Sequence, residues 1–184
     1  MKVLEAILAR RSIRKFTASS VSSDDEDAVI DAAFAAPSAE NLRPWHFVVI
    51  RDPAMRVRLS KVHDWSWMLA VTPLVVAVLG RADSRWFIED CSAAVENMLL
   101  TATERGLGSI WVGIRDQTAE SCGSRPCEYE RSCARLLGIP SDWRVLCLVG
   151  IGHPAQHKAP RSQRESEKLS YERFGVRRYL TDEP

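Results

Sequence analysis

Short apolar runs, separated by one long helical pattern, constrain the fold of this chain more than any other feature. Each run is rich in valine, leucine or isoleucine and bounded by glycine, proline or charged residues, which is typical of β-strands. Between the second and third runs, apolar residues recur at helical spacing from Asp83 to Gly106, where glycine can end the helix. The predicted strands cover residues 46–52, 73–80, 108–114 and 144–152.

Shorter helices are predicted before and between these strands. Residues 3–8 have apolar positions at helical spacing, which predicts a helix running up to a basic cluster. A second helix is expected from Ser23, in a capping-box pattern, to Pro37, because proline cannot continue a helix. Asp-Pro at 52–53 predicts a helix start, and 129–137 another short helix. The elements favour an α+β fold in which helices surround one mixed sheet.

Composition limits the class of protein. A chain of 184 residues with 46% hydrophobic residues can bury one sizeable core, and we expect a single domain over residues 1–184. The net charge is +1, which counts against nucleic acid or an anionic membrane as partner. The apolar stretches are too short to cross a bilayer, and the amino terminus does not resemble a signal sequence. We therefore expect a cytoplasmic protein. Five cysteines without a CxxC pair predict reduced thiols and no metal site.

Three arginines and a serine are packed near the amino terminus as Arg10, Arg11, Ser12 and Arg14. A guanidinium presents a planar fork of donors that matches phosphate oxygens, and Arg10 and Arg14 would share one face of a continued helix. The cluster therefore predicts a phosphate ligand. Basic residues also favour the last turn of a helix, so a solvated helix end explains the same residues equally well.

Two further segments offer contacts to a ligand. Residues 36–45 place Pro37, Ser38 and Asn41 in a loop, where an asparagine amide could read the polar edge of a heterocycle. These residue types also favour ordinary turns, which is the simpler interpretation. The glycines of 106–113 could let a backbone approach a planar ligand, or could only end the helix. That segment runs from helix to strand, the reverse of a GxGxxG fingerprint, so no Rossmann fold is inferred.

Other catalytic patterns are weak. The histidines lack metal-ligand spacing, and no GxSxG nucleophile elbow is present, so neither a metal site nor a serine hydrolase is expected. Cys122, Cys127 and Cys133 lie in a polar stretch where a redox role has little support. Trp65 and Trp67 could line the mouth of a substrate site as exposed aromatics, or could be buried in the core.

Taken in order, five segments resemble the nitroreductase family of flavoproteins. They are LEAILARRSIRKF, APSAENLRPWHFVVI, DCSAAVENMLLTATERGLGSIWVG, LLGIP and VGIGHP, the last leading into a basic tail. The resemblance covers nearly the whole chain. It implies an intertwined homodimer that holds FMN in a cleft between its subunits, with NADH or NADPH as electron donor and a small-molecule acceptor.

The resemblance also implies a cofactor site built from four short segments. The residues carried over by position are Arg10, Arg11, Ser12, Arg14, Pro37, Ser38, Ala39, Asn41, Trp111, Val112, Gly113, Arg161 and Arg164. The first group resembles a phosphate site, with Arg14 near the N1 and O2 edge of the flavin, where it would stabilise negative charge on reduction. Residues 37–41 resemble the partner subunit's contribution, and 111–113 the backbone that faces the ring and its N5. The tail arginines resemble cations that close on the phosphate.

The implied activity is reduction of nitroaromatics, quinones or similar electron-poor substrates by NAD(P)H through FMN, in a ping-pong cycle. Such chemistry needs no protein nucleophile, so no catalytic residue is named. An FMN-binding storage or sensing protein without turnover is an alternative, as is a reductive dehalogenase of the same fold. Residues 52–72 leave little chain for a lid, which disfavours the dehalogenase. The near-neutral net charge disfavours a nucleic-acid binder based on the basic tail.

Overall fold

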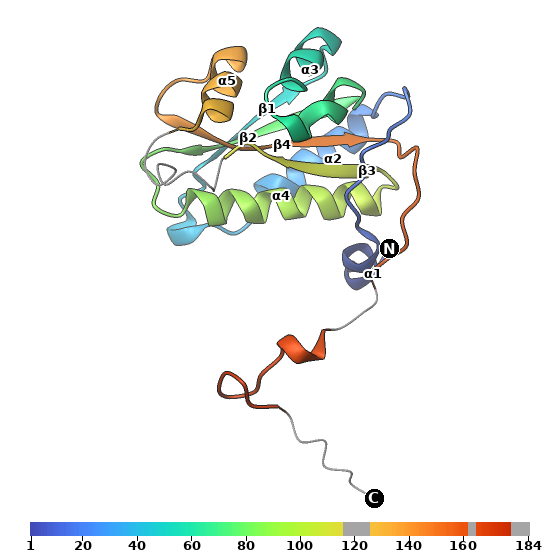
Figure 1. Cartoon of the computed structure of the whole chain (residues 1–184), viewed down its shortest axis with the longest axis vertical. Helices are drawn as coiled ribbons and strands as arrows, with labels where there is room; N and C mark the ends of the chain where they lie inside the picture. Colours follow the sequence, from blue (N-terminus) through green and yellow to red (C-terminus); the bar gives the residue numbers. More distant parts are fainter. Residues whose placement is uncertain (116–125, 162–164, 178–184) are drawn as a thin grey trace, which may run out of the picture.

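The computed structural model describes residues 1–115, 126–161 and 165–177 (Figure 1). Its strands are β1 (Trp45–Ile50), β2 (Leu74–Arg81), β3 (Gly108–Gly113) and β4 (Trp143–Gly152). They form a sheet in the order β1-β2-β4-β3, and each neighbouring pair is antiparallel. An isolated bridge between Ser12 and Ser109 adds a parallel contact. The predicted strands and the α+β class are confirmed.

Helices cover both faces of the sheet (Figure 1). One face carries α2 (Ser23–Phe34) and α4 (Phe87–Glu104), and the other carries α3 (Pro53–Leu59), the 3-10 helix η2 (Asp64–Ala70) and α5 (Glu128–Leu137). The remaining helices are α1 (Val3–Ala9), which packs on α4, and the single turns η1 (Ala39–Asn41) and η3 (Ser166–Lys168). Within the described ranges, no helix has the length and apolar character needed to span a membrane.

The central strands β2 and β4 are buried on both faces. Leu74, Val76 and Val78 of β2 pack into the core beneath α2 and α4, whereas Val75 and Ala77 pack into the core on the opposite face. Successive side chains of a strand point to opposite faces, so both sets must be apolar when helices cover both sides. This explains why β2 is a continuous apolar run in the sequence instead of an alternating pattern.

Local signals in the sequence place most helix ends, with small shifts. Ser22 caps α2 one residue earlier than expected, its Oγ accepting from the Asp25 amide at 3.1 Å. The Asp52 carboxylate accepts from the Met55 amide at 2.9 Å, which confirms the predicted start of α3. The predicted glycine cap of α4 is also confirmed, because Gly106 adopts a left-handed φ of 73°.

An amino-terminal segment, residues 12–17, crosses the ends of β3 and β4. The Ile13 amide donates to the Ser109 carbonyl and the Thr17 amide to the His153 carbonyl, both at 2.9 Å. The segment therefore joins the edge of the sheet near the ends of two strands, and it carries Arg14 with it.

Two glycines leave room for this segment. A Cβ atom on Gly108 would lie 2.9 Å from side-chain atoms of Ile13, and one on Gly152 would lie 2.5 Å from the Pro73 ring and 3.1 Å from Phe16. Real Cβ atoms do not tolerate contacts this short in a packed interior. The crossing segment and its neighbours can therefore lie against the strand ends only where those residues lack a side chain.

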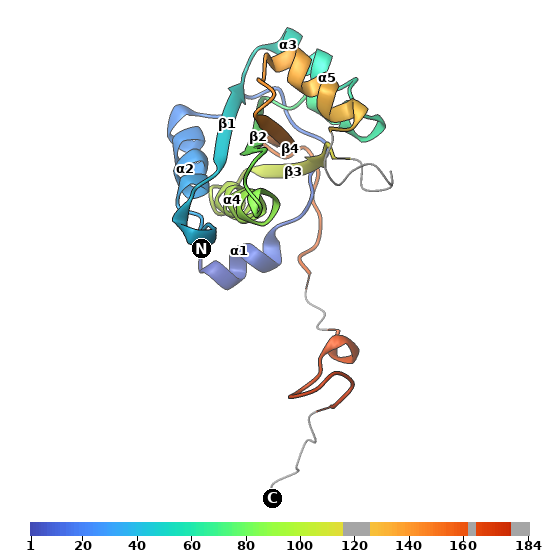
Figure 2. The same cartoon turned by 90° about the vertical axis from the view of Figure 1, so that its left-hand side faces the viewer.

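After β4 the chain first runs along the amino-terminal segment, and its later part lies outside the body of the domain (Figure 2). Residues 165–177 lie well away from the sheet in both views, and the Phe174 side chain is fully exposed. An exposed phenylalanine on an extended segment gains nothing from the core of its own chain.

Replacing Gly152 by alanine is expected to lower the free energy of unfolding by about 1–3 kcal/mol, because overpacking a rigid neighbour carries that cost. Gly113→Ala is the matched control, since nothing lies within 4 Å of the position of its Cβ. Urea denaturation followed by circular dichroism measures both. Equal stability of the two variants would contradict the packing role assigned to Gly152.

Candidate functional site

Cationic side chains from two distant parts of the chain meet beside the start of β3. The Lys158 ammonium donates to the Ser12 carbonyl at 2.7 Å, and the Arg11 guanidinium donates to a carbonyl in the segment after β4. The backbone amide of Arg161 donates to the Leu8 carbonyl at 3.0 Å. The segment after β4 thus runs alongside the amino-terminal segment, and we call Arg11, Arg14 and Lys158 the cation cluster.

The cation cluster has an excess of positive charge. Burial lowers the pKa of Lys158, and the positive charges of Arg14 and Arg11 lower it further. Over the described residues, no carboxylate oxygen lies within 4.0 Å of the charged nitrogens of the cluster. Cations held together without a neutralising carboxylate form a surface that favours a compact anion such as phosphate.

Other predicted phosphate residues are placed differently. Arg10 ends α1, and its Nε lies 3.7 Å from a carboxylate oxygen of Glu96 in α4, so its charge is balanced within the chain. Ser12 is half-buried and forms the bridge to Ser109. Arg164 lies outside the described residues. The unbalanced charge in this region therefore belongs to the cation cluster.

Two buried polar atoms, on segments that adjoin the cation cluster along the chain or through a backbone bridge, have no hydrogen-bond partner among the described residues. One is Oγ of Ser109, at the bridge to Ser12, and the other is Nε2 of Gln156, on the segment that carries Lys158. Leaving a buried polar group unpaired costs about 1–3 kcal/mol. Hydroxyl, amide, ammonium and guanidinium donors together are a donor set that suits phosphate oxygens. The residues present therefore fit the phosphate end of a nucleotide cofactor.

The loop of residues 37–43 has an unusual backbone. Glu40, Asn41 and Arg43 have φ angles of 52°, 56° and 49°, in the left-handed region that disfavours residues with a Cβ. Hydrogen bonds within the loop stabilise it: Ser38 Oγ accepts from the Arg43 amide at 2.9 Å, and Asn41 Oδ1 accepts from Arg43 Nε at 3.0 Å. Backbones held in rare conformations concentrate at functional sites.

Asp90 attaches this loop to α4. Its side chain is only 6% exposed, and Oδ1 accepts a hydrogen bond from the Ala39 amide at 2.9 Å. Oδ2 is buried and has no partner in the described part of the chain. Sequence reasoning missed Asp90, because an acidic residue in the first turn of a helix is already explained by the helix dipole.

The loop and the cation cluster lie at opposite ends of α4 within one chain (Figure 1). The loop is attached at Asp90, in the first turn of α4, whereas the cluster lies beside Ser109, just past the last turn. From Asp90 to its last residue, Glu104, α4 rises about 21 Å at 1.5 Å per residue. A single chain therefore does not bring together the two groups that the sequence predicted to share one ligand.

The predicted ring-facing residues form the last half of β3. Trp111 packs toward the core beneath α4, while Val112 is buried in the opposite core. Gly113 is exposed, with open space where a Cβ would stand. The backbone at Gly113 is therefore accessible to a flat ligand, and its lack of a side chain is not explained by packing among the described residues.

Buried thiols do not supply a nucleophile. Burial raises the pKa of Cys91 and of Cys133 to about 12, and burial also raises that of Cys147. The thiolate is the reactive form of cysteine, and it is disfavoured at all three positions. Cys127 Sγ donates to the Ile114 carbonyl at 3.2 Å, and Cys122 lies outside the described residues.

Trp65 and Trp67 lie on η2 and are 70% and 51% exposed. The interpretation that these indoles belong to the core is therefore wrong for the single chain. Exposed indoles remain available to contact an aromatic ligand or another protein surface.

Comparison with known proteins gives consistent matches. The profile of the Nitroreductase family matches residues 7–73 and 68–153. A protein assigned as an NADH dehydrogenase/NAD(P)H nitroreductase from Methanothermobacter thermautotrophicus is 33% identical over 179 residues, which cover 95% of this chain and 88% of the relative. The structure of an FMN-dependent nitroreductase from Clostridium difficile R20291 is 28% identical, with a TM-score of 0.85 over 93% of this chain and 99% of that one. A structure from Desulfovibrio desulfuricans, described as a nitroreductase in complex with FMN, is 28% identical, with a TM-score of 0.75 over 95% and 98% of the two chains.

The fold and these matches define the chain as an oxidoreductase of the flavoprotein class, and the cation cluster fits that class. More particularly, the chain belongs to the nitroreductase family. This confirms the resemblance stated from the sequence, the nitroreductase fold and the enzyme class. FMN, the expected cofactor, is named for the two similar structures, and NAD(P)H, the expected donor, is named for the relative from Methanothermobacter thermautotrophicus.

The Asp90→Ala variant is expected to release the loop of residues 37–43, because the Ala39 amide loses its acceptor. That amide should exchange with solvent at least about 10-fold faster, since a hydrogen bond to a charged group contributes about 1.5–3 kcal/mol. Hydrogen–deuterium exchange of the loop measures this. Glu89→Ala, which removes an exposed carboxylate from the same turn, should leave exchange unchanged. Identical exchange in the two variants would show that Asp90 does not hold the loop.

Proposed function

We propose that this protein binds FMN and uses NADH or NADPH to reduce electron-poor acceptors such as nitroaromatics and quinones. The observation that carries the proposal is the cation cluster, for which the described residues supply no balancing carboxylate. Two buried polar atoms on segments joined to it, Ser109 Oγ and Gln156 Nε2, also lack a hydrogen-bond partner among those residues. A phosphate would satisfy both features. The FMN named for two structures similar to this chain along nearly its whole length supports that choice of ligand.

The chain's own residues have binding and orienting roles in this proposal. Arg11 and Lys158 bind the phosphate, with Ser12 beside them and the tail arginines Arg161 and Arg164 closing over it. Arg14 lies near the N1 and O2 edge, where a fixed positive charge stabilises the reduced ring. Bound FMN supplies the two-electron redox chemistry. Donor and acceptor occupy the same exposed site in turn, which gives a ping-pong order, and no side chain bonds covalently to either.

We further propose that a second copy of the chain completes each site. Pro37, Ser38, Ala39 and Asn41 lie at the far end of α4 from the cation cluster, so only the partner's loop can reach it. Two other features support a homodimer, because exposed apolar surface favours association. They are the exposed apolar side chains of α1, namely Val3, Leu4, Ile7 and Leu8, and the exposed Phe174 of the tail.

The Lys158→Met variant is expected to bind FMN about 10-fold more weakly, because one charge-assisted hydrogen bond to the phosphate is lost. A thermal melt without FMN checks that the variant is folded, since Lys158→Met also loses the hydrogen bond to the Ser12 carbonyl. Titration of apoprotein with FMN, followed by flavin fluorescence, measures the affinity. Lys61→Met, at an exposed lysine outside the cluster, is the control. Equal affinity in both variants would remove Lys158 from the phosphate site.

Anaerobic reduction of the reconstituted wild-type protein then tests the activity. NADH and NADPH are added in parallel and the flavin absorbance is followed, before nitroaromatics and quinones are supplied as acceptors. Bleaching and reoxidation support the oxidoreductase. A flavin that is bound but never bleached identifies a storage or sensing protein, and a protein that cannot take up FMN at all refutes the proposal.

Subunit complementation tests the shared site. Arg11→Ala/Arg14→Ala and Ser38→Ala/Asn41→Ala are expected to bind little FMN as homodimers. In a heterodimer of the two, one site receives both defects and the other neither, so about one FMN should bind per dimer. Differently tagged chains allow the heterodimer to be purified and its flavin content measured. A heterodimer without flavin would mean that each site is built from a single chain.

A further inference from the structure

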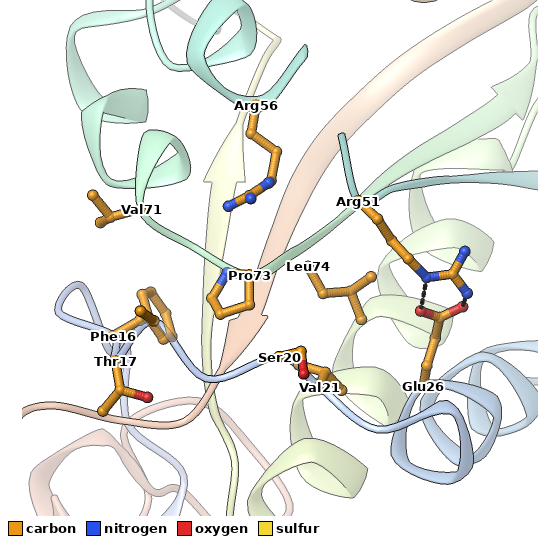
Figure 3. Close-up of a pocket in the computed structure, with 11 residues that line it drawn as sticks. Phe16, Thr17, Ser20, Val21, Glu26, Arg51, Arg56, Val71, Pro73 and Leu74 are labelled. Carbon is orange, nitrogen blue, oxygen red and sulfur yellow. Dashed lines mark hydrogen bonds and ion pairs between the residues drawn. The ribbon is translucent and has the colours of Figure 1, made fainter. Parts of the chain in front are cut away.

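A separate cavity lies between residues 16–21, the end of β1 and the residues that lead into β2 (Figure 3). Its volume is about 540 Å³, within the range of small-molecule sites. No residue of the cation cluster lines it. The lining side chains that matter here are Phe16, Glu26, Arg51, Arg56, Pro73 and Leu74.

Arg51 and Glu26 neutralise each other at one side of this cavity. Arg51 Nε donates to one carboxylate oxygen of Glu26 at 2.8 Å, and its Nη2 donates to the other, as the dashed lines of Figure 3 show. Glu26 is only 7% exposed, so its carboxylate is committed to this bidentate pair. The pair therefore adds no net charge to the cavity.

Arg56 remains as the unbalanced charge. Its side chain extends from α3 into the cavity above Pro73, and Nη1 donates to the Thr72 carbonyl (Figure 3). Within the described ranges, no carboxylate lies within 4.0 Å of it, and Nε is buried without a hydrogen-bond partner. A single unbalanced positive charge beside the apolar side chains of Phe16, Pro73 and Leu74 favours a ligand with one negative charge on an apolar body.

Two other arginines of the protein show how a carboxylate meets a guanidinium here. Arg51 and Arg144 each present Nε and Nη2, the side edge of the guanidinium, to the two oxygens of Glu26 and Glu130. In Arg56 the backbone carbonyl takes Nη1, and the Nε–Nη2 edge has no acceptor among the described residues. The same edge is therefore left for a carboxylate from outside the chain.

We propose that this cavity binds a small organic monocarboxylate. Its carboxylate pairs side-on with the Nε–Nη2 edge of Arg56, and its apolar body lies against Phe16, Pro73 and Leu74. One unbalanced guanidinium matches one carboxylate and leaves the second charge of a phosphate dianion uncompensated. The site is independent of the flavin site in its residues, so it stands or falls separately from the proposed function.

Calorimetric titration of the full-length protein with 2-naphthoate tests this site. The neutral isostere 2-naphthamide has nearly the same shape and should bind about 10- to 100-fold more weakly, the loss expected when a charge-assisted hydrogen-bonded pair is removed. This comparison uses only the wild-type protein and so does not depend on the folding of a variant. Absence of naphthoate binding, or equal affinity for the amide, overturns the proposal.

A matched pair of variants locates the site. Arg56→Met keeps the apolar stem and should lose naphthoate affinity by the same about 10- to 100-fold. Arg58→Met removes an exposed arginine from the same helix and should bind as the wild type does. Thermal melting confirms that both variants are folded. Unchanged affinity in Arg56→Met would refute the assigned carboxylate partner.

Discussion

The close approach of the amino-terminal segment to the ends of β3 and β4 is the constraint on which the candidate site depends. Gly108 accepts the Ile13 side chain against its backbone, and Gly152 accepts Pro73 and Phe16. A side chain at position 108 would clash with Ile13 of the segment, and one at position 152 chiefly with Pro73. The segment also carries Arg14, and it lies beside Lys158, whose ammonium donates to the Ser12 carbonyl. The lack of side chains at Gly108 and Gly152 thus allows the segment that carries Arg14 to lie close to the strand ends.

The positive charge of the cation cluster disfavours the ligand-free fold but favours binding of an anion. The chain as a whole carries a net charge of only +1, yet Arg11, Arg14 and Lys158 are held together with no carboxylate among the described residues to balance them. Mutual repulsion and burial both disfavour this arrangement in the absence of a ligand. In the proposed site a bound phosphate offsets this repulsion, because each cation becomes a charge-assisted donor to it. The same reasoning applies on a smaller scale to Arg56, which faces the separate cavity alone.

The position of the loop at 37–43 supports the proposal that a second copy of the chain completes each site. Asp90 holds the loop at the first turn of α4, and its left-handed residues are stabilised by hydrogen bonds to Ser38 and Asn41. The helix that supports the loop also separates it from the cation cluster. A loop held far from its own cluster is placed to contact a neighbouring subunit, which connects the geometry of one chain to the proposed dimer.

The sequence by itself determined the strands, most helix ends and the family, because those follow from side-chain period, from caps such as Asp52 and Gly106, and from motifs in order along the chain. It also proposed Arg10, Arg11 and Arg14 as phosphate ligands, which stays a prediction, but it did not indicate that Glu96 pairs with Arg10. Only the tertiary structure decided that Lys158 joins the cluster, that Asp90 fastens the loop and that Arg56 lacks a counter-ion. Each of these depends on a contact, or on the absence of one among the described residues, between positions far apart in the chain. The periodicity of a local segment does not predict such contacts, because the packing of helices and strands sets the distances between residues far apart in the sequence.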